Sequence, residues 1–203
     1  MQSYPIPVQA ETIVEETIKK SRFITYIVHT VGVDAAKSVV QMIKEHHPAA
    51  RHHCWAFVAG APNDSQQLGF SDDGEPSGTA GKPMLAQLMG SGLGEVTAVV
   101  VRYYGGIMLG TGGLVKAYGG GVQQALQQVE RHIKIPKKVY RLQCQYSQLT
   151  EIERIVQRYQ GELRDTHFTE HVTVNIALPE ALLAECNEAL SQFSRGELHL
   201  QQQ

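Results

Sequence analysis

The sequence has no long apolar run, no apolar stretch at its start and little net charge. A membrane-spanning helix needs about 20 mostly apolar residues, and no run in this chain reaches that length. The formal net charge is −2, so the chain has no overall cationic field that would hold nucleic acid without specificity. We therefore expect a soluble cytoplasmic protein without a targeting segment, in which any contact with RNA is made by a local basic patch.

Cysteine is scarce, and its spacing excludes two kinds of stabilising site. Cys54, Cys144 and Cys186 are odd in number and far apart, which argues against a disulfide framework and against a structural zinc site. A reducing compartment fits this pattern. On a strand, His52 would share a face with Cys54, whereas His53 would point to the other face. Two ligands without a third do not make a zinc site, so we expect no bound metal.

Signatures of common catalytic sites are also missing. The chain has no P-loop, no protein-kinase motif and no nucleophile elbow, so we favour a protein that is not an enzyme and has no cofactor. One alternative stays open. The acidic turn formed by Asp72, Asp73 and Glu75 suits a hard cation such as magnesium beside a bound phosphate, although acids are common in turns without any ligand.

The clearest strand in the sequence covers residues 96–101. This run is apolar and rich in β-branched residues, a pattern typical of a central strand that is covered on both faces. Arg102 and Tyr103 follow where the strand leaves the core. Gly105 and Gly106 then end the strand, because glycine tolerates a backbone with positive φ.

Two helices are predicted to start in glycine-rich sequence. Thr111 is the expected cap of a helix with a buried stripe that includes Leu114 and Tyr118, and Pro83 suits the first turn of an earlier helix. A helix start with few side chains above it offers free N–H groups to an anion, such as an RNA phosphate or a carboxylate. The bland alternative is that these glycines only form tight turns and close packing. The candidate ligand-binding or RNA-binding residues are Lys82, Arg102, Tyr103, Gly105, Gly106, Gly110, Thr111, Gly112, Gly113, Lys116, His52 and His53.

The remaining chain divides at a basic segment between residues 131 and 138. Before it, two extended runs at residues 12–18 and 23–30 predict a hairpin, and Asp34 is the expected cap of a helix. After it, strand and helix patterns alternate in the order βαββαβ, with Leu198 and Leu200 marking the last strand. This order is that of a ferredoxin-like domain. We therefore predict an N-terminal domain at residues 1–133 and a C-terminal domain at residues 134–203.

Two long blocks carry a family resemblance. They read SDDGEPSGTAGKPML at residues 71–85 and TAVVVRYYGGIMLGTGGLVKAY at residues 97–118, and residues 20–23, His52 and His53 add to them. Nearly the whole chain resembles the bacterial members of the IMPACT family. The resemblance implies an α+β protein with a ribosomal protein S5 domain 2-like N-terminal domain, in which helices lie on one face of a mixed sheet, followed by a ferredoxin-like C-terminal domain. It also implies an arrangement like two successive domains of elongation factor G.

The resemblance suggests a role linked to translation. Eukaryotic members are regarded as translational regulators that act through an additional RWD module, which has no counterpart in these residues. The first reading is a regulatory binding protein that contacts RNA, the ribosome or a translation factor through a glycine-rich, locally basic concavity. The second is an enzyme or sensor of a small phosphorylated ligand, bound at the same helix N-termini beside the acids of the turn. The sequence does not fix the oligomeric state.

Overall fold

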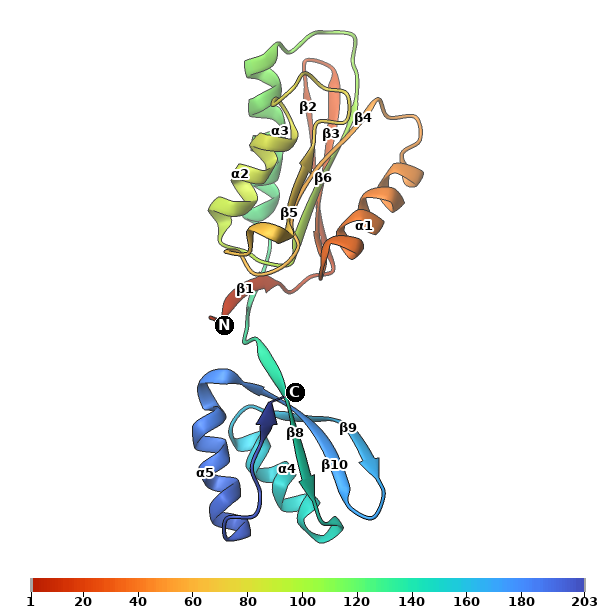
Figure 1. Ribbon diagram of the computed structural model, residues 1–203. Helices are drawn as coiled ribbons and strands as arrows, with labels where there is room; N and C mark the ends of the chain where they lie inside the picture. The colour runs from red at the N-terminus through yellow and green to blue at the C-terminus, as the bar shows by residue number, and fades with distance from the viewer. Residues whose placement is uncertain (1, 203) are drawn as a thin grey trace. The chain divides into compact units, whose positions relative to one another are not determined.

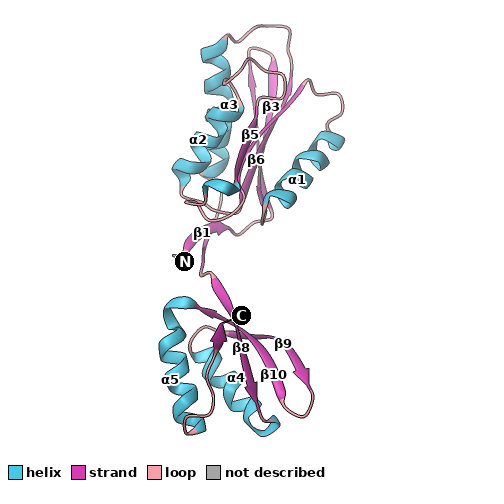
Figure 2. Cartoon of the chain, in the orientation of Figure 1, coloured by secondary structure: helices cyan, strands magenta, loops and turns pink. Residues whose placement is uncertain are grey.

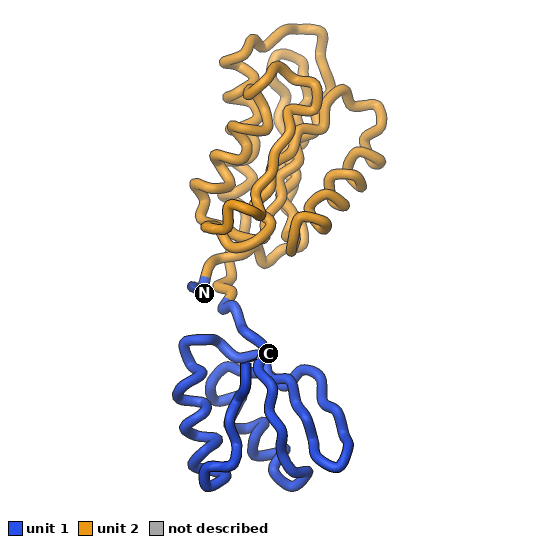
Figure 3. Tube along the Cα trace, viewed as in Figure 1, with its two compact units in different colours: residues 1–3, 135–203 blue, residues 4–134 orange. Residues whose placement is uncertain are grey.

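The computed structural model describes residues 2–202, and the chain forms two compact units (Figure 3). One unit is Tyr4–Lys134, and the other contains residues 135–202. Both combine helices with antiparallel sheets, so the α+β fold class is confirmed. No helix within residues 2–202 is both long enough and apolar enough to cross a bilayer.

The first unit is built on a five-stranded sheet with the strand order β2-β3-β6-β4-β5 (Figure 1). Its strands are β2 (Glu11–Ile18), β3 (Ser21–His29), β4 (His52–Val58), β5 (Leu68–Ser71) and β6 (Val96–Tyr103). As predicted, β6 lies at the centre, and every residue from Val96 to Val101 is buried. All pairs in the sheet are antiparallel, so the mixed sheet that the resemblance implied is wrong in this detail.

Helices cover both faces of this sheet, whereas the resemblance implied one covered face (Figure 1). α2 (Gly81–Ser91) and α3 (Thr111–Leu126) share a core with one face of β6, which includes Ala98 and Val100. α1 (Val33–His46) lies on the other face, where Val40 and Ile43 contact Val99 and Val101. Successive side chains of β6 point to opposite faces of the sheet, so this strand contributes residues to both cores.

The N-cap residues of two helices lie one or two positions before the residues that the sequence predicted as caps. The residue before α1 is Gly32 with φ 85°, and the residue before α3 is Gly110 with φ 75°. Both conformations favour glycine because it has no Cβ atom. Asp34 and Thr111 lie inside the first turns, and neither side chain caps its helix. The expected caps at these two residues are therefore wrong.

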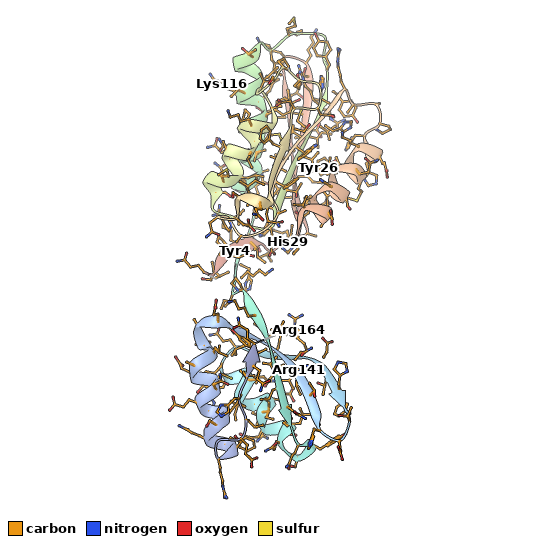
Figure 4. The ribbon with its side chains drawn as sticks, viewed as in Figure 1. Tyr4, Tyr26, His29, Lys116, Arg141 and Arg164 are labelled. Carbon is orange, nitrogen blue, oxygen red and sulfur yellow. The ribbon has the colours of Figure 1, made fainter. Side chains whose placement is uncertain are left out.

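The ends of the first unit are joined by a small sheet of β1 (Tyr4–Pro7) and β7 (Arg131–Lys134). Glu95 is buried beside this sheet, and it accepts hydrogen bonds from the Tyr4 hydroxyl at 2.9 Å and from the Lys134 ammonium. His29 Nε2 lies 3.0 Å from the same carboxylate (Figure 4 labels Tyr4 and His29). Burial alone would raise the pKa of Glu95. The hydrogen bonds from these partners have the larger effect, so the pKa is lower than the usual value. The carboxylate is therefore held ionised beside the small sheet.

The second unit has the predicted ferredoxin-like order (Figure 2). Its antiparallel sheet has the strand order β11-β8-β10-β9, and α4 and α5 share a core with it. Its elements are β8 (Lys137–Cys144), α4 (Leu149–Arg158), β9 (Glu162–Phe168), β10 (Val172–Pro179), α5 (Leu183–Ser194) and β11 (Gln201–Gln202). Leu198 and Leu200, which were expected to mark the last strand, instead fill the core just before β11.

Candidate functional site

A buried polar cluster lies where β6 ends. The Arg102 guanidinium donates from Nη1 to Glu75 Oε1 at 2.6 Å and from Nη2 to the Ser21 hydroxyl at 3.3 Å. The Tyr118 hydroxyl of α3 donates to the same Glu75 oxygen at 2.7 Å. Four segments that are distant in sequence thus meet in one hydrogen-bonded cluster around Arg102 and Glu75. Burial raises the pKa of Tyr118 far above its usual range, so this phenol stays protonated as a donor.

The register of the sheet places Arg102 in this cluster. Arg102 pairs with Phe23 on β3 and with His52 on β4. Its Cζ atom lies 5.4 Å from the ring centres of Phe23 and Tyr104, so aromatic groups border the guanidinium. The buried Nε atom has no hydrogen-bond partner among the described residues.

These contacts correct the role expected for Arg102. Its side chain was predicted to be a local cation for an RNA phosphate, but the residue is only 5% exposed and its charge is paired with Glu75. Arg102 is therefore not a surface contact for a polyanion. It lies in the wall of a cavity instead.

His52 lies at the rim of the same cavity with one ring nitrogen already fixed. Its Nδ1 donates to the backbone carbonyl of Asp73 at 2.8 Å, because a carbonyl oxygen can only accept. Its Nε2 lies 3.8 Å from Glu75 Oε1. Nε2 is therefore the ring atom that remains for a ligand.

The three carboxylates of the acidic turn have separate partners. Asp73 accepts the His53 N–H at 2.7 Å and the Lys44 ammonium at 3.0 Å. Burial alone would raise the pKa of Asp73. The hydrogen bonds from these donors have the larger effect, so the pKa is lower than the usual value. Glu75 accepts hydrogen bonds from Arg102 and Tyr118, and Asp72 accepts hydrogen bonds at the start of α2. These carboxylates therefore do not converge on one point, and residues 2–202 contain no group of three or more potential metal ligands. This arrangement gives the magnesium alternative no support.

Asp72 occupies the start of α2. Its Oδ1 accepts the N–H groups of Ala80 at 3.1 Å and Gly81 at 2.8 Å, and its Oδ2 accepts the N–H of Gly78 at 2.8 Å. Burial alone would raise the pKa of Asp72. The hydrogen bonds from these three donors have the larger effect, so the pKa is lower than the usual value. The prediction that α2 presents free donors to an anion is therefore wrong, because the chain supplies its own anion.

The start of α3 is open. Within residues 2–202, the N–H groups of Thr111, Gly112 and Gly113 have no hydrogen-bond acceptor, and the Gly110 carbonyl already accepts the Leu114 N–H at 3.0 Å. This helix start borders a cavity of about 420 Å³. The cavity is lined by Arg51, His52, Gly74, Glu75, Pro76, Arg102, Tyr104, Met108, Leu109, Gly110, Thr111 and Leu114.

The two predicted lysines lie together in a different place. Lys82 on α2 and Lys116 on α3 line a groove of about 550 Å³ between the two helices (Figure 4 labels Lys116). We call this the lysine groove. It is lined by Gly78, Lys82, Pro83, Ala86, Gln87, Val115, Lys116, Gly119, Gly120 and Gln123. The groove and the cavity share no lining residue, so the single basic concavity expected from the sequence is divided in two.

Tyr103 and His53 face the α1 side of the sheet, away from Arg102. The Tyr103 hydroxyl lies 2.8 Å from His47 Nδ1, and His53 donates from Nε2 to the His47 carbonyl at 2.9 Å. The Tyr26 hydroxyl contacts the other His47 nitrogen at 2.6 Å (Figure 4 labels Tyr26). Burial, together with nearby positive groups, lowers the pKa of His47. Neither Tyr103 nor His53 lines the cavity or the lysine groove, so their assignment to one ligand site with Arg102 is wrong.

Gly105 and Gly106 shape the end of β6 without lining the cavity. A Cβ atom at Gly105 would lie 2.0 Å from the carbonyl oxygen of Lys20, in the turn between β2 and β3. Gly106 has φ 84°, as expected for a residue that ends the strand. The Ser21 hydroxyl accepts the Gly105 N–H at 3.2 Å, which fixes the turn and the strand end together.

Four residues of the site with polar side chains were not among the sequence candidates. Ser21 and Tyr118 hold the polar cluster, and Arg51 and Tyr104 line the cavity. Tyr118 was predicted as a buried helical residue, and its hydroxyl was the available signal, because a buried phenol needs a hydrogen-bond partner. For Arg51, the position beside a predicted strand end gave no indication of a partner. Its side chain lies over the Tyr104 ring at 5.4 Å.

The chain is thus a two-domain α+β protein. In its first domain, the central strand β6 ends at two glycines beside a buried polar cluster. The model described as the Impact N-terminal domain matches residues 19–126, and a model described as a domain of unknown function (DUF1949) matches residues 142–197. The chain belongs to the IMPACT family.

Similar proteins cover the chain from end to end. It is 62% identical over 200 residues to the IMPACT family member YigZ of Escherichia coli, and the matched region covers 98% of each chain. An IMPACT family member of Haemophilus influenzae is 52% identical over 201 residues, covering 99% of this chain and 97% of the relative. A crystal structure described as that of a hypothetical protein is 60% identical, with a TM-score of 0.81 and coverage of 100% of this chain and 98% of the other.

Proposed function

We propose that this chain is a cytoplasmic, translation-linked regulatory binding protein that contacts RNA through the lysine groove. The observation that carries the proposal is the pairing of Lys82 and Lys116 in one groove whose lining contains no carboxylate. Neither ammonium has an ion-pair partner in the described part of the chain. Two unpaired cations facing one groove are suited to successive phosphates of a nucleic acid strand.

The rest of the groove fits this ligand. Gln87 and Gln123 provide amide groups that hydrogen-bond to phosphate and sugar oxygens. Gly119 and Gly120 leave the helix surface without bulky side chains, so a strand can approach the backbone closely. The link to translation rests on membership of the IMPACT family, because eukaryotic IMPACT proteins are regarded as translational regulators. The buried Arg102 has no part in this contact.

Ribosome and RNA binding under salt titration tests the proposal. Lys82→Glu/Lys116→Glu is expected to weaken binding, and each lost phosphate contact lowers the slope of log affinity against log salt by about one. Lys37→Glu is the matched control, because Lys37 is an exposed lysine of α1 on the opposite side of the sheet. Cosedimentation with ribosomes, and fluorescence anisotropy with single-stranded RNA, measure both quantities.

The proposal fails if the double variant and the Lys37 control bind RNA alike. Ribonuclease treatment of ribosome complexes separates the possible partners. Loss of the complex after digestion supports RNA as the partner. A complex that survives digestion and still depends on Lys82 and Lys116 indicates an acidic protein surface and contradicts an RNA contact.

A further inference from the structure

We propose that the cavity at the start of α3 binds a small molecule through its phosphate monoester group, with a flat ring as the other part of the ligand. A nucleoside monophosphate is the ligand class that fits. This site goes beyond the RNA contact proposed for the lysine groove and does not depend on it. The proposal rests on the open helix start, on Arg102, on the charge of the cavity wall and on its apolar side.

The helix start provides N–H groups without competition from the protein. Thr111, Gly112 and Gly113 present three successive free N–H groups, which match the several oxygens of a phosphate. A Cβ atom at Gly112 would meet no atom within 4 Å, so the space beside these donors is open. α3 has 16 residues and therefore a full dipole that favours an anion at this end. At the start of α2, the Asp72 carboxylate accepts backbone N–H groups of the same kind. It shows how an anion would bind at the start of α3.

Arg102 is the second, independent indication of a ligand. Its side chain lines the cavity and is 5% exposed, and its Nε has no partner among the described residues. A buried donor without an acceptor is unfavourable, and more so when it belongs to a charged group. An oxygen atom of a ligand, bound directly or through a water molecule, supplies the missing acceptor.

The charge of the cavity wall favours an anionic ligand. Arg51 and Arg102 carry two positive charges and Glu75 carries one negative charge, which leaves one positive charge in excess. His52 adds the ring nitrogen Nε2 as a further polar contact, because its Nδ1 already donates to the Asp73 carbonyl. A phosphate monoester also presents three strong acceptor oxygens, so it matches the several N–H donors of this site better than a carboxylate with two oxygens.

The other side of the cavity is apolar and partly aromatic. Tyr104 is 41% exposed and Met108 is 81% exposed, and both line the opening together with the buried Leu109 and Leu114. A nucleobase stacks on an exposed aromatic ring, and the flexible thioether of methionine adapts to such a ring. The volume of about 420 Å³ lies within the range of small-molecule sites.

Titration of the whole chain with three probes tests the site. We expect adenosine monophosphate to bind more tightly than inorganic phosphate or adenosine, because only the nucleotide uses both sides of the cavity. Calorimetry gives the affinities, and amide NMR shifts at Thr111, Gly112 and Gly113 locate the site. A short RNA with a 5′ phosphate is the further arm. If it shifts these amides and the free nucleotide does not, the small-molecule assignment is overturned.

Two aspartate substitutions on the same helix provide a matched pair. Gly112→Asp places a carboxylate in the first turn, where it suits the helix dipole, and it should reduce nucleotide affinity at least tenfold by repelling the phosphate. Gly120→Asp introduces the same charge on the exposed face of α3, four residues after Lys116 in the lysine groove. It should leave nucleotide binding unchanged and weaken RNA binding.

The pair also separates the two proposals. Nucleotide binding that is absent, or that persists unchanged in Gly112→Asp, overturns this inference while RNA binding still tests the lysine groove. RNA binding that is absent while nucleotide binding persists overturns only the proposed function. Circular dichroism checks that Gly112→Asp is folded. If it is not, His52→Gln serves as the second variant and should also weaken nucleotide binding, because it removes the ring nitrogen Nε2 at the rim of the cavity.

Discussion

At the scale of single residues, Asp72 determines which helix start is available to a ligand. Its carboxylate accepts three backbone N–H groups from Gly78, Ala80 and Gly81. A bound anion at this position would have to displace a charged group that is already part of the chain. Selectivity between the two glycine-rich helix starts of this domain therefore comes from one side chain.

The same contacts predict how stability depends on pH. Because the pKa of Asp72 is lowered in the folded chain, its contribution to stability is fully present above the unfolded value of about 3.9 and is lost as the pH falls through the lower folded value. Asp72→Asn should lower the free energy of unfolding at neutral pH by about 1–2 kcal/mol, a loss typical of a helix cap. It should also flatten the decline in stability below pH 4.

Urea unfolding between pH 3 and pH 7 measures this effect. Trp55 is the single tryptophan of the chain and lies on β4, so its fluorescence reports on the first unit. Asp34→Asn is the control, because Asp34 is an exposed acid in the first turn of α1 whose side chain makes no capping hydrogen bond. Equal pH profiles for Asp72→Asn and the unsubstituted chain would contradict the assigned role of Asp72.

Residue-level roles were only partly predictable from the sequence. The alternation of strand residues correctly placed His52 and His53 on opposite faces, because that periodicity is local. The partners of Asp72 and Glu75 were not predictable, since they lie across a turn of irregular backbone or on distant elements. Arg102 follows a buried strand, but only the register of three strands shows that its charge is neutralised inside the domain.

At the scale of elements, the three consecutive glycines in the middle of α3, Gly119 to Gly121, have different surroundings. A Cβ atom at Gly121 would lie 2.6 Å from the buried Thr25 hydroxyl oxygen on β3. At Gly119 it would lie 3.6 Å from Pro83, an ordinary contact, and at Gly120 it would meet nothing within 4 Å. Of these three glycines, only Gly121 is required for close packing of α3 on the sheet.

Neighbouring alanine substitutions therefore have opposite predicted effects. Gly120→Ala should stabilise the first unit by up to about 1 kcal/mol, because alanine is the better helix former and its methyl group has room. Gly121→Ala should destabilise it by about 1–3 kcal/mol, because the added methyl group forces α3 away from β3. Thermal and urea unfolding of the two variants, followed by Trp55 fluorescence, compare them directly. The same sign for both would show that α3 shifts freely on the sheet.

The central sheet shows how residue patterns and family resemblance differ as guides. The nearly unbroken apolar run of residues 96–101 predicted a strand covered on both faces, and α1 does cover the second face. The resemblance implied one covered face and a mixed sheet, and the structure corrects both details. The local hydrophobic pattern was the better guide, because burial of each face acts directly on the residues of that strand.

At the scale of the whole molecule, the chain builds separate cores. One face of the first sheet packs on α2 and α3, the other on α1, and a further cluster fills the second unit. None of these cores contains residues from both units. The βαββαβ order of the second unit was predictable because each of its elements has a clear period, whereas the predicted division after residue 133 remains a prediction.

Separate cores imply separate unfolding, and the three cysteines provide a probe for it. Cys54 is buried in the first unit, and Cys144 and Cys186 are buried in the second. Burial raises the pKa of the Cys54 and Cys144 thiols, and it raises that of Cys186 to about 11, so none reacts readily while its unit is folded.

We therefore expect alkylation by iodoacetamide in increasing urea to occur in two steps. Cys144 and Cys186 should become reactive together and at lower urea, because a smaller unit buries a smaller fraction of its surface. Cys54 should become reactive later, at the urea concentration where the Trp55 fluorescence changes. Mass spectrometry of the digested chain assigns each alkylated cysteine. Simultaneous reaction of all three would mean that the units unfold as one cooperative body, since reactivity then follows a single opening equilibrium.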